Sequence, residues 1–254
     1  MREKYPSIEQ INDADRIRMV KDIFATITGK YDFLNHFLSL RRDVAWRRFA
    51  VRQMRFFNTS RFLDVATGTS DLAIEGALCY PDIRVTGVDF VQEMLDQGVK
   101  KVEKRGLSQR MDLMKGDALH LPFPDNSFDT AGIAFGIRNI PDKARALKEM
   151  RRIVVAGGQV LVLEMTFPRI PCFRQFYDLY LNRILPLLAR TFSPNPGAYH
   201  YLGESIMNFP SVKGFAGMMK DAGLANVKTY VLTLGICHLF MGQKPNPDKP
   251  ASGS

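Results

Sequence analysis

Short β-rich runs alternate with helical patterns between residues 61 and 164, and this alternation limits the folds open to the chain. Strands that alternate with helices form parallel sheets, because each connection has to cross a face of the sheet before the next strand begins. We expect five such strands, at 62–66, 83–89, 111–114, 128–134 and 159–164. The helices between them are expected at 71–78, 91–105 and 142–154.

The remainder of the chain completes this expected sheet. Two further β-rich runs, at 227–233 and 236–242, predict a hairpin at its edge. Gly157 and Gly158 are expected to end the preceding helix as a C-cap. The expected fold class is α/β: a doubly wound, Rossmann-like sheet, mostly parallel, with an antiparallel edge hairpin and a helical N-terminal cover.

Composition shifts define the expected domains. Residues 1–60 look helical and form the cover, and residues 61–242 form the main domain. Within that domain, residues 167–210 are an aromatic-rich insertion that we expect to close over a site. The tail at 243–254, rich in Pro, Gly and Ser, is expected to be disordered.

The overall composition excludes several classes of protein. The 254 residues are 46% hydrophobic and 24% charged, as in soluble globular proteins. No run of about 18 apolar residues occurs, and residues 1–6 do not resemble a secretory signal, so we expect a cytoplasmic protein. The three cysteines, Cys79, Cys172 and Cys237, have no close spacing and the four histidines do not cluster. Neither a disulfide framework nor a metal site is therefore expected.

Positive charge is concentrated near the N-terminus. The formal net charge is +9, and residues 41–61 hold seven arginines against one acid, Asp43. Segment 44–57 is amphipathic, with Arg47, Arg48, Arg52 and Arg55 opposite Trp46, Phe49, Ala50, Met54, Phe56 and Phe57. Such a helix either packs on a core with its charged face in water, or docks on an anionic membrane surface, here at the inner face of the membrane. No nucleic acid partner is expected, because no RNA-binding module is recognisable, and the oligomeric state stays open, a homodimer included.

The string from Leu63 to Asp71 is a strand, a turn of small residues and a helix start. Such a turn brings backbone close to a ligand at the carboxyl edge of a parallel sheet. Asp64, Asp89 and Asp117 fall at the ends of three successive predicted strands, so their carboxylates are expected to meet at that edge. Asp89 can accept hydrogen bonds from both ribose hydroxyls of a nucleoside, and Asp117 can accept one from an adenine amino group.

The turn distinguishes between two nucleotide cofactors. A pyrophosphate site needs the pattern G-x-G-x-x-G, but with Gly68 in first place Ser70 and Ala73 stand at the other two. Asp64 and Asp71 would also repel phosphates, whereas they attract the sulfonium and amino groups of S-adenosylmethionine. The sequence therefore predicts S-adenosylmethionine as the cofactor, and an NAD-dependent oxidoreductase is disfavoured.

Several strings together resemble the ubiquinone/menaquinone biosynthesis C-methyltransferase family, within the class I S-adenosylmethionine-dependent methyltransferases. The resemblance covers about residues 20 to 242. The narrow motifs are Tyr31-Asp32-Phe33-Leu34-Asn35 and Phe135-Gly136-Ile137-Arg138-Asn139, and the broader ones are the turn after Leu63 and Leu121-Pro122-Phe123-Pro124-Asp125. The resemblance implies an enzyme that methylates a ring carbon of a polyprenylated quinol, demethylmenaquinone-like.

The resemblance also implies site residues. Cofactor contacts are expected at Asp64, Gly68, Thr69, Asp89, Asp117, Ala118 and Ala134. The chain departs from the family pattern at Asp43, Ser70 and Ala134, where the family has histidine, glycine and usually serine. A serine at position 70 is accommodated easily if its φ is negative.

The chemistry on the acceptor requires few protein groups. The methyl donor is already activated, so the enzyme mainly positions the partners and stabilises a phenolate. The expected catalytic residues are Arg138, which follows the fourth strand and would stabilise the phenolate, Tyr31 and Asp32 as contacts to substrate hydroxyls, and Glu164, which would orient Arg138 or ring hydroxyls. Asn139, His200 and Tyr201 are expected to contact the substrate. Arginine stays protonated, so a carboxylate or bound water has to take the proton.

Other functions stay open on the sequence alone. A small-molecule O- or N-methyltransferase, with a soluble phenolic or amine acceptor, could use the same framework. An RNA methyltransferase would use Cys172 as its nucleophile, but the motifs that accompany such a cysteine are missing. A non-catalytic partner protein with the same fold would transfer no methyl group at all.

Overall fold

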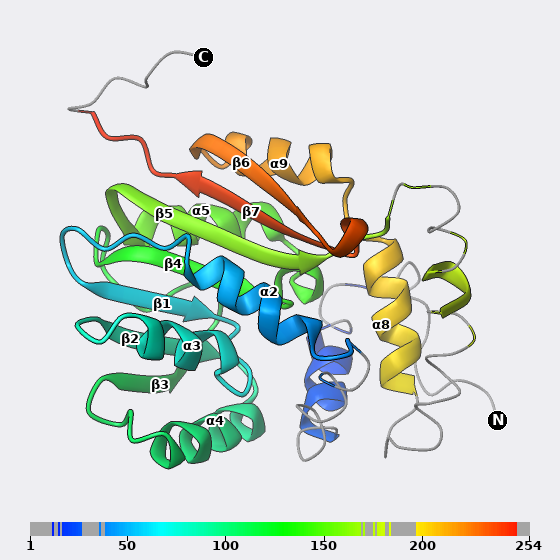
Figure 1. Cartoon of the computed structure of the whole chain (residues 1–254), viewed down its shortest axis with the longest axis horizontal. Helices are drawn as coiled ribbons and strands as arrows, with labels where there is room; N and C mark the ends of the chain where they lie inside the picture. The colour runs from blue at the N-terminus through cyan, green and yellow to red at the C-terminus, as the bar shows by residue number, and fades with distance from the viewer. Residues whose placement is uncertain are drawn as a thin grey trace.

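The computed structural model describes residues 12, 15, 17–26, 36, 39–168, 170, 175, 177–180, 183 and 197–247, and of residues 197–200 the backbone alone. A seven-stranded sheet with the order β3-β2-β1-β4-β5-β7-β6 forms its centre (Figure 1). The strands are β1 Arg61–Val65, β2 Arg84–Asp89, β3 Met111–Lys115, β4 Phe128–Ala134, β5 Val154–Met165, β6 Ala225–Leu232 and β7 Cys237–Gln243. The first five are parallel and β7 is antiparallel to both β5 and β6, which confirms the predicted fold class.

Helices cover both faces of the sheet. One face carries α2 Arg42–Val51, α3 Asp71–Cys79 and α4 Gln92–Lys104, whose apolar side chains form one core cluster with strand residues such as Phe62 and Val85. The other face carries α5 Lys143–Ile153 and α9 Val212–Asp221, packed in a second cluster around Phe215 and Phe240. Because helices cover both faces, β4 is buried without alternation from Phe128 to Ile133, and β5 from Gly158 to Glu164.

The predicted C-cap at Gly157 and Gly158 was wrong. α5 ends at Ile153, and β5 begins at the next residue and continues through both glycines. They form an irregularity in the pairing with β4, where Val154 pairs with Phe128 but Gln159 pairs with Thr130. Gly157 has a φ of +78°, and a Cβ on Gly158 would lie 2.8 Å from the Asp129 carbonyl oxygen. The glycines therefore make a bulge that brings β4 and β5 close together.

The arginine-rich segment is a shorter helix than expected. α2 spans ten residues and buries Trp46, Ala50 and Val51 against α3 and β5. Arg47, predicted on the charged face of the helix, is buried instead, because the carboxylates of Asp43 and Asp71 lie against it. Phe57, predicted on the apolar side, lies beyond the helix and is 58% exposed.

A third group of side chains packs beyond the carboxyl ends of the parallel strands. Helical residues 17–26, residues 177–180 and α8 Gly197–Met207 contribute Val20, Ile23, Tyr177, Tyr201 and Ile206 to one apolar cluster. Figure 1 shows the arrowheads of β1, β4 and β5 pointing toward the side where α8 lies. Part of the predicted cover and part of the predicted insertion thus meet at the edge where ligands bind in such sheets.

The chain is ordered beyond the predicted start of the tail. Gln243 belongs to β7, the Lys244 N–H donates to the Gly158 carbonyl oxygen at 2.9 Å, and the Lys244 ammonium donates to the Val154 carbonyl oxygen at 2.9 Å. Residues 248–254 lie outside the described residues. Within the part of the chain that the structure describes, no helix combines the length and apolar character needed to cross a bilayer.

Candidate active site

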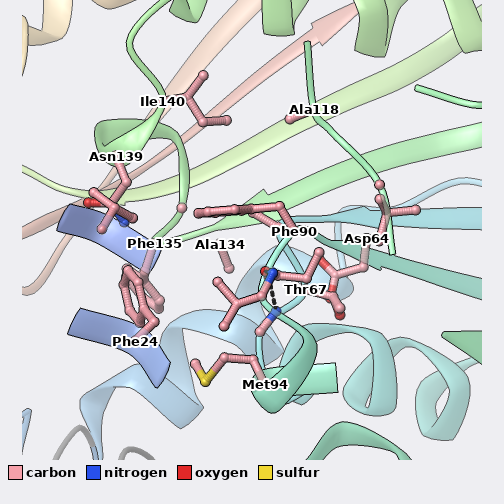
Figure 2. A pocket seen from close by; sticks show the side chains of 18 of the residues that line it. Phe24, Asp64, Thr67, Phe90, Met94, Ala118, Ala134, Phe135, Asn139 and Ile140 are labelled. Atoms are coloured by element: carbon pink, nitrogen blue, oxygen red, sulfur yellow. Dashed lines mark hydrogen bonds between the residues drawn. The ribbon is translucent and has the colours of Figure 1, made fainter. Parts of the chain in front are cut away.

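A cavity of about 300 Å³ lies at the carboxyl ends of β1 to β4. Its lining divides into two chemically different parts. The turn after β1, the ends of β2 and β3 and the start of α3 supply carboxylates, hydroxyls and exposed backbone. Residues 17–26, the residues after β4 and Phe90 supply mostly apolar side chains. In Figure 2, Asp64 and Ala118 lie on one side of the view, and Phe24, Phe135 and Asn139 lie on the other.

Asp89 organises the turn after β1. Its carboxylate accepts hydrogen bonds from the Gly68 N–H at 2.8 Å and from the Val91 N–H at 2.9 Å. Burial raises the pKa of Asp89, and these two backbone donors partly offset that effect. Gly68 needs its φ of +56° to present this N–H, which explains a glycine at that position.

Asp64 is the most deeply buried carboxylate of the cavity wall. Its Oδ2 accepts hydrogen bonds from the Thr67 hydroxyl at 2.6 Å and the Ala73 N–H at 3.1 Å, and its Oδ1 accepts none from the described residues. Burial raises the pKa of Asp64 to about 7, despite these two donors and the nearby charge of Arg47. A cation that binds in the cavity therefore finds a carboxylate whose charge depends on pH near neutrality.

The other predicted cofactor contacts also lie at this edge. Asp117 and Ala118 line the cavity, and the Asp117 carboxylate, 59% exposed, accepts a hydrogen bond from the Leu119 N–H. Thr69 lines the turn, and its hydroxyl accepts a hydrogen bond from the Lys101 ammonium at 3.1 Å. Ala134 lines the cavity at the end of β4.

Ser70 adopts a left-handed backbone conformation, for which a serine is poorly suited. A serine would replace the family's glycine easily at a negative φ, but the φ of Ser70 is +69°. The side chain is buried, and its hydroxyl has no hydrogen-bond partner among the described residues. Gly98 of α4 makes room for it, since a Cβ there would lie 2.5 Å from the Ser70 Oγ.

Arg138 and Glu164 form a buried ion pair behind the cavity wall. The Arg138 Nη1 lies 2.6 Å from the Glu164 Oε1 and donates to the Phe135 carbonyl oxygen at 2.7 Å. The Glu164 side chain is 0% exposed, and neither residue is among the described ones that line the cavity. Arg138 thus forms a hydrogen bond with the backbone of Phe135, whose φ is +58°. The side chain of Phe135 lines the cavity.

Asn139 lines the cavity itself. Its amide oxygen accepts a hydrogen bond from the Tyr201 hydroxyl at 3.1 Å, and no described residue accepts one from its amide nitrogen. Asn139 does not cap the next helix, because Asp142 takes that position and accepts from the Arg145 N–H. Tyr201 is buried in α8 and is not among the described residues that line the cavity, but its hydroxyl contacts that lining at Asn139.

Three predicted residues cannot be placed. Tyr31 and Asp32 lie outside the described residues, and the His200 side chain is not described. The cavity wall also includes three residues that were not predicted there: Arg47, Phe24 and Phe135. The burial of Arg47 could have been predicted only from its spacing, since Asp43 lies four residues earlier on the same helix face.

His36, Asp43 and Asp71 present three potential metal ligands within 4.8 Å of one another. Arg47 and Lys101 already bond these carboxylates, so two protein cations stand where a metal ion would. The cluster is therefore a network of ion pairs.

Comparison with known proteins identifies the relatives of this site. The model of the ubiE/COQ5 methyltransferase family matches residues 10–244. The chain belongs to the ubiE/COQ5 methyltransferase family. It is 43% identical, over 89% of its length and 96% of the relative's, to the ubiquinone/menaquinone biosynthesis C-methyltransferase UbiE of Geotalea uraniireducens. It is 41% identical, over 90% of its length and 97% of the relative's, to the demethylmenaquinone methyltransferase of Bacillus cytotoxicus.

The solved structures agree with the fold of this ubiE/COQ5 methyltransferase family member. A possible histamine N-methyltransferase from Thermotoga maritima superposes with a TM-score of 0.60 at 21% identity, over 88% of this chain and 98% of that one. Family and fold together confirm the predictions of a methyltransferase enzyme, of a class I fold and of S-adenosylmethionine as the cofactor.

The cavity of this family member fits S-adenosylmethionine chemically. Among the described residues, four carboxylates line it, those of Asp64, Asp71, Asp89 and Asp117. They suit a ligand with a sulfonium and an amino group and disfavour a pyrophosphate. Small residues such as Ala66 and Gly116 leave backbone exposed for close approach. Its size lies within the range of ligand sites.

Proposed function

We propose that the protein transfers a methyl group from S-adenosylmethionine to a ring carbon of a polyprenylated quinol, a demethylmenaquinone-like precursor of a respiratory quinone. The observation that carries this proposal is the division of one cavity into a carboxylate-lined part and an aromatic part. When bound, S-adenosylmethionine supplies a methyl group that is already electrophilic. The names and identities of the relatives support the same acceptor class.

The carboxylate-lined part holds the methyl donor. Asp89, fixed by the Gly68 and Val91 N–H groups, accepts hydrogen bonds from the ribose hydroxyls. Asp117 and Ala118, at the far end of the cavity lining, contact the adenine. Asp64 attracts the positive charge of the donor through its Oδ1, while Thr69 and Ala134 complete the wall.

The aromatic part holds the acceptor ring. Phe24, Phe90, Phe135 and Ile140 supply an apolar surface that fits a fused or prenylated ring and excludes water. Asn139 adds a polar group on this side. Because its amide oxygen accepts from Tyr201, its amide N–H groups are left to donate to a ring oxygen, which stabilises negative charge as the phenolate forms.

Arg138 and Glu164 position the residues after β4. The Arg138 side chain bonds the Phe135 carbonyl, and Glu164 bonds both the side chain and the backbone N–H of Arg138. These bonds hold Phe135 in a left-handed conformation that a bulky residue rarely adopts. Arg138 thereby fixes the Phe135 ring and the adjacent Asn139 against the acceptor.

Tyr31, Asp32 and His200 complete the proposed acceptor site. Tyr31 and Asp32 contact the substrate hydroxyls from the N-terminal cover, and His200, a residue of α8, contacts the ring. The Asn139 amide cannot take up a proton, so a carboxylate or a bound water accepts the one that the ring loses.

The exposed arginines near α2 bind the protein to an anionic membrane surface. Arg41, Arg42, Arg48, Arg52 and Arg55 are exposed, and Leu40, beside the first two, is 81% exposed. Exposed cations beside an apolar side chain favour anionic lipid, where a polyprenyl substrate resides. In a flotation assay at low salt we expect binding to phosphatidylglycerol vesicles but not to phosphatidylcholine vesicles, and binding to neither would contradict this part of the proposal.

Incubation with methyl-labelled S-adenosylmethionine tests the proposed reaction. We expect label in reduced demethylmenaquinone dispersed in detergent, and none in the oxidised quinone, because only the quinol has a ring hydroxyl to ionise. Asn139→Ala tests the site, with Asn208→Ala, at an exposed turn, as its matched control. Label in soluble phenols or amines but not in the quinol would overturn the proposal in favour of a small-molecule O- or N-methyltransferase.

A further inference from the structure

Arg47 is the only cationic side chain among the described residues that line the cavity. It comes from α2, outside the strand-end positions that the fold makes available to ligands. Only 8% of it is exposed, and its guanidinium carbon lies 5.2 Å from the centre of the Phe135 ring. A buried guanidinium is costly unless charged partners surround it, so its position in this wall requires explanation.

Two carboxylates hold Arg47 in place. Its Nη1 lies 2.6 Å from the Asp43 Oδ2, one helical turn earlier on α2, and 3.6 Å from the Asp71 Oδ2 at the start of α3. Asp71 is also bonded by the Lys101 ammonium. The guanidinium therefore lies between the start of α3 and the Phe135 ring, where the carboxylate-lined part of the cavity meets the aromatic part.

Asp43 is itself fixed from a second side. The Ser39 hydroxyl donates to its Oδ1 at 2.6 Å, and the His36 Nδ1 lies 2.7 Å from its Oδ2. Burial opposes the ionisation of Asp43, but the Ser39 hydroxyl and Arg47 outweigh it and keep the pKa of Asp43 below its usual value. Asp43 is thus a charged anchor for the Arg47 guanidinium.

One charged group of S-adenosylmethionine is not complementary to the carboxylates of the cavity wall. S-adenosylmethionine carries a sulfonium, an ammonium and one carboxylate. The four lining carboxylates suit its two positive groups but repel its carboxylate, which needs a donor of positive charge. We infer that Arg47 binds the carboxylate of the methionine part of the methyl donor, and that Asp43 is the residue that positions it. This inference rests on the proposed use of S-adenosylmethionine.

Binding of two nucleosides by calorimetry tests the inference without catalysis. S-adenosylhomocysteine has the amino acid carboxylate, whereas 5′-methylthioadenosine shares its nucleoside but lacks the amino acid part. We expect Arg47→Met to weaken binding of S-adenosylhomocysteine by roughly 10- to 100-fold, as expected for a charge-assisted hydrogen bond, and binding of methylthioadenosine by no more than about threefold. Arg48→Met, on the exposed side of the same helix, is the matched control and should change neither.

A double variant that removes both charges shows whether misfolding explains the loss of binding. Arg47→Met leaves the buried Asp43 carboxylate without its arginine partner, so Asp43→Asn/Arg47→Met should fold more readily and show the same selective loss. Asp43→Asn alone keeps the guanidinium but loses its anchor, and should weaken binding of S-adenosylhomocysteine by roughly threefold to tenfold. Binding of methylthioadenosine shows in each case that the variant is folded.

The outcomes separate this inference from the proposed function. Equal losses for both nucleosides, or no loss for S-adenosylhomocysteine, would overturn the role of Arg47 while leaving the methyl donor in place. Unchanged nucleoside binding with a raised KM for the quinol would overturn it in favour of an acceptor contact. Failure of the wild-type protein to bind either nucleoside would overturn both the inference and the proposed function.

Discussion

The Glu164 carboxylate bonds Arg138 twice, accepting from its guanidinium at 2.6 Å and from its backbone N–H at 3.2 Å. Glu164 lies near the end of β5, and Arg138 lies in the short helix η2 Ile137–Asn139 that follows β4. Since β4 and β5 are paired neighbours, this ion pair ties the conformation after β4 to the sheet. Loss of the tie should therefore affect both stability and catalysis.

Glu164→Gln is expected to lower the free energy of unfolding by about 3 kcal/mol, because it leaves the Arg138 charge buried without its partner. Chemical denaturation measures this loss. Arg138→Met/Glu164→Leu removes both charges and should recover most of the stability, yet kcat should stay low because Phe135 and Asn139 are no longer held. A double variant with wild-type kcat would show that the pair serves stability alone.

Asp64 should make folding stability depend on pH. Its pKa is raised from 3.8 to about 7 in the folded protein, so the folded state holds a proton there that the unfolded state has lost. Stability from this group is therefore complete below about pH 4 and decreases as pH rises to about 7. Each pKa unit corresponds to about 1.4 kcal/mol, so Asp64→Asn, which can keep both bonds to Oδ2, should be more stable than wild type by at least about 1 kcal/mol at pH 8. Thermal unfolding at pH 5 and pH 8 checks this; the same difference at both values would contradict it.

The same carboxyl should couple cofactor binding to protons. A positively charged ligand favours ionised Asp64, so binding at about pH 7 should release a proton, and affinity should fall as pH decreases below 7. Calorimetry in two buffers with different ionisation enthalpies measures the proton release. Asp64→Asn should bind S-adenosylmethionine more weakly and release no proton. Proton release that persists in this variant would assign it to another group.

Ser70→Gly should stabilise the protein by about 1 kcal/mol, since glycine adopts a φ of +69° without strain. For a chain of this size the gain corresponds to a rise in Tm of about 2–4 °C. Ser70→Ala separates the two causes, because it removes the unpartnered hydroxyl but keeps the strained backbone. A larger gain for alanine than for glycine would identify the hydroxyl as the main cost.

Asn139→Ala should lower kcat by about 100- to 1000-fold, as expected for loss of a donor to a developing oxyanion. Binding of S-adenosylhomocysteine should not change, because Asn139 lies on the acceptor side of the cavity. Tyr201→Phe removes the hydroxyl that orients the amide, and we expect a kcat loss of about tenfold. If Tyr201→Phe changed stability but not kcat, the hydrogen bond to Asn139 would be structural only.

The sequence was sufficient for features that local patterns determine. Asp64, Asp89 and Asp117 were predicted at three strand ends because strand periods and turn residues are readable without the partner strand, and all three line the cavity. The edge hairpin was predicted for the same reason. The Gly157–Gly158 bulge was missed, because it depends on the register with β4, which no local pattern contains.

Long-range charge pairing explains the other differences. Amphipathicity placed Arg47 on the charged face of the helix, and only its pairing with Asp43 and Asp71, the latter on another helix, allows it to be buried. Arg138 was expected to reach the acceptor, with Glu164 orienting it or ring hydroxyls; the two residues do pair, but neither is among the described residues that line the cavity. Such pairings follow from the assembled fold, whereas residue type and spacing indicate only that the groups are available.

The atom that receives the methyl group distinguishes C-methylation of the quinol from O-methylation. The protein should be incubated with S-adenosylmethionine carrying a ¹³C-labelled methyl group and with reduced demethylmenaquinone, and the product should be examined by NMR. We predict that the labelled methyl is bonded to a ring carbon, beside an intact hydroxyl. A labelled methyl on oxygen would contradict the proposed reaction. So would an unlabelled quinol, if the same protein sample binds the cofactor.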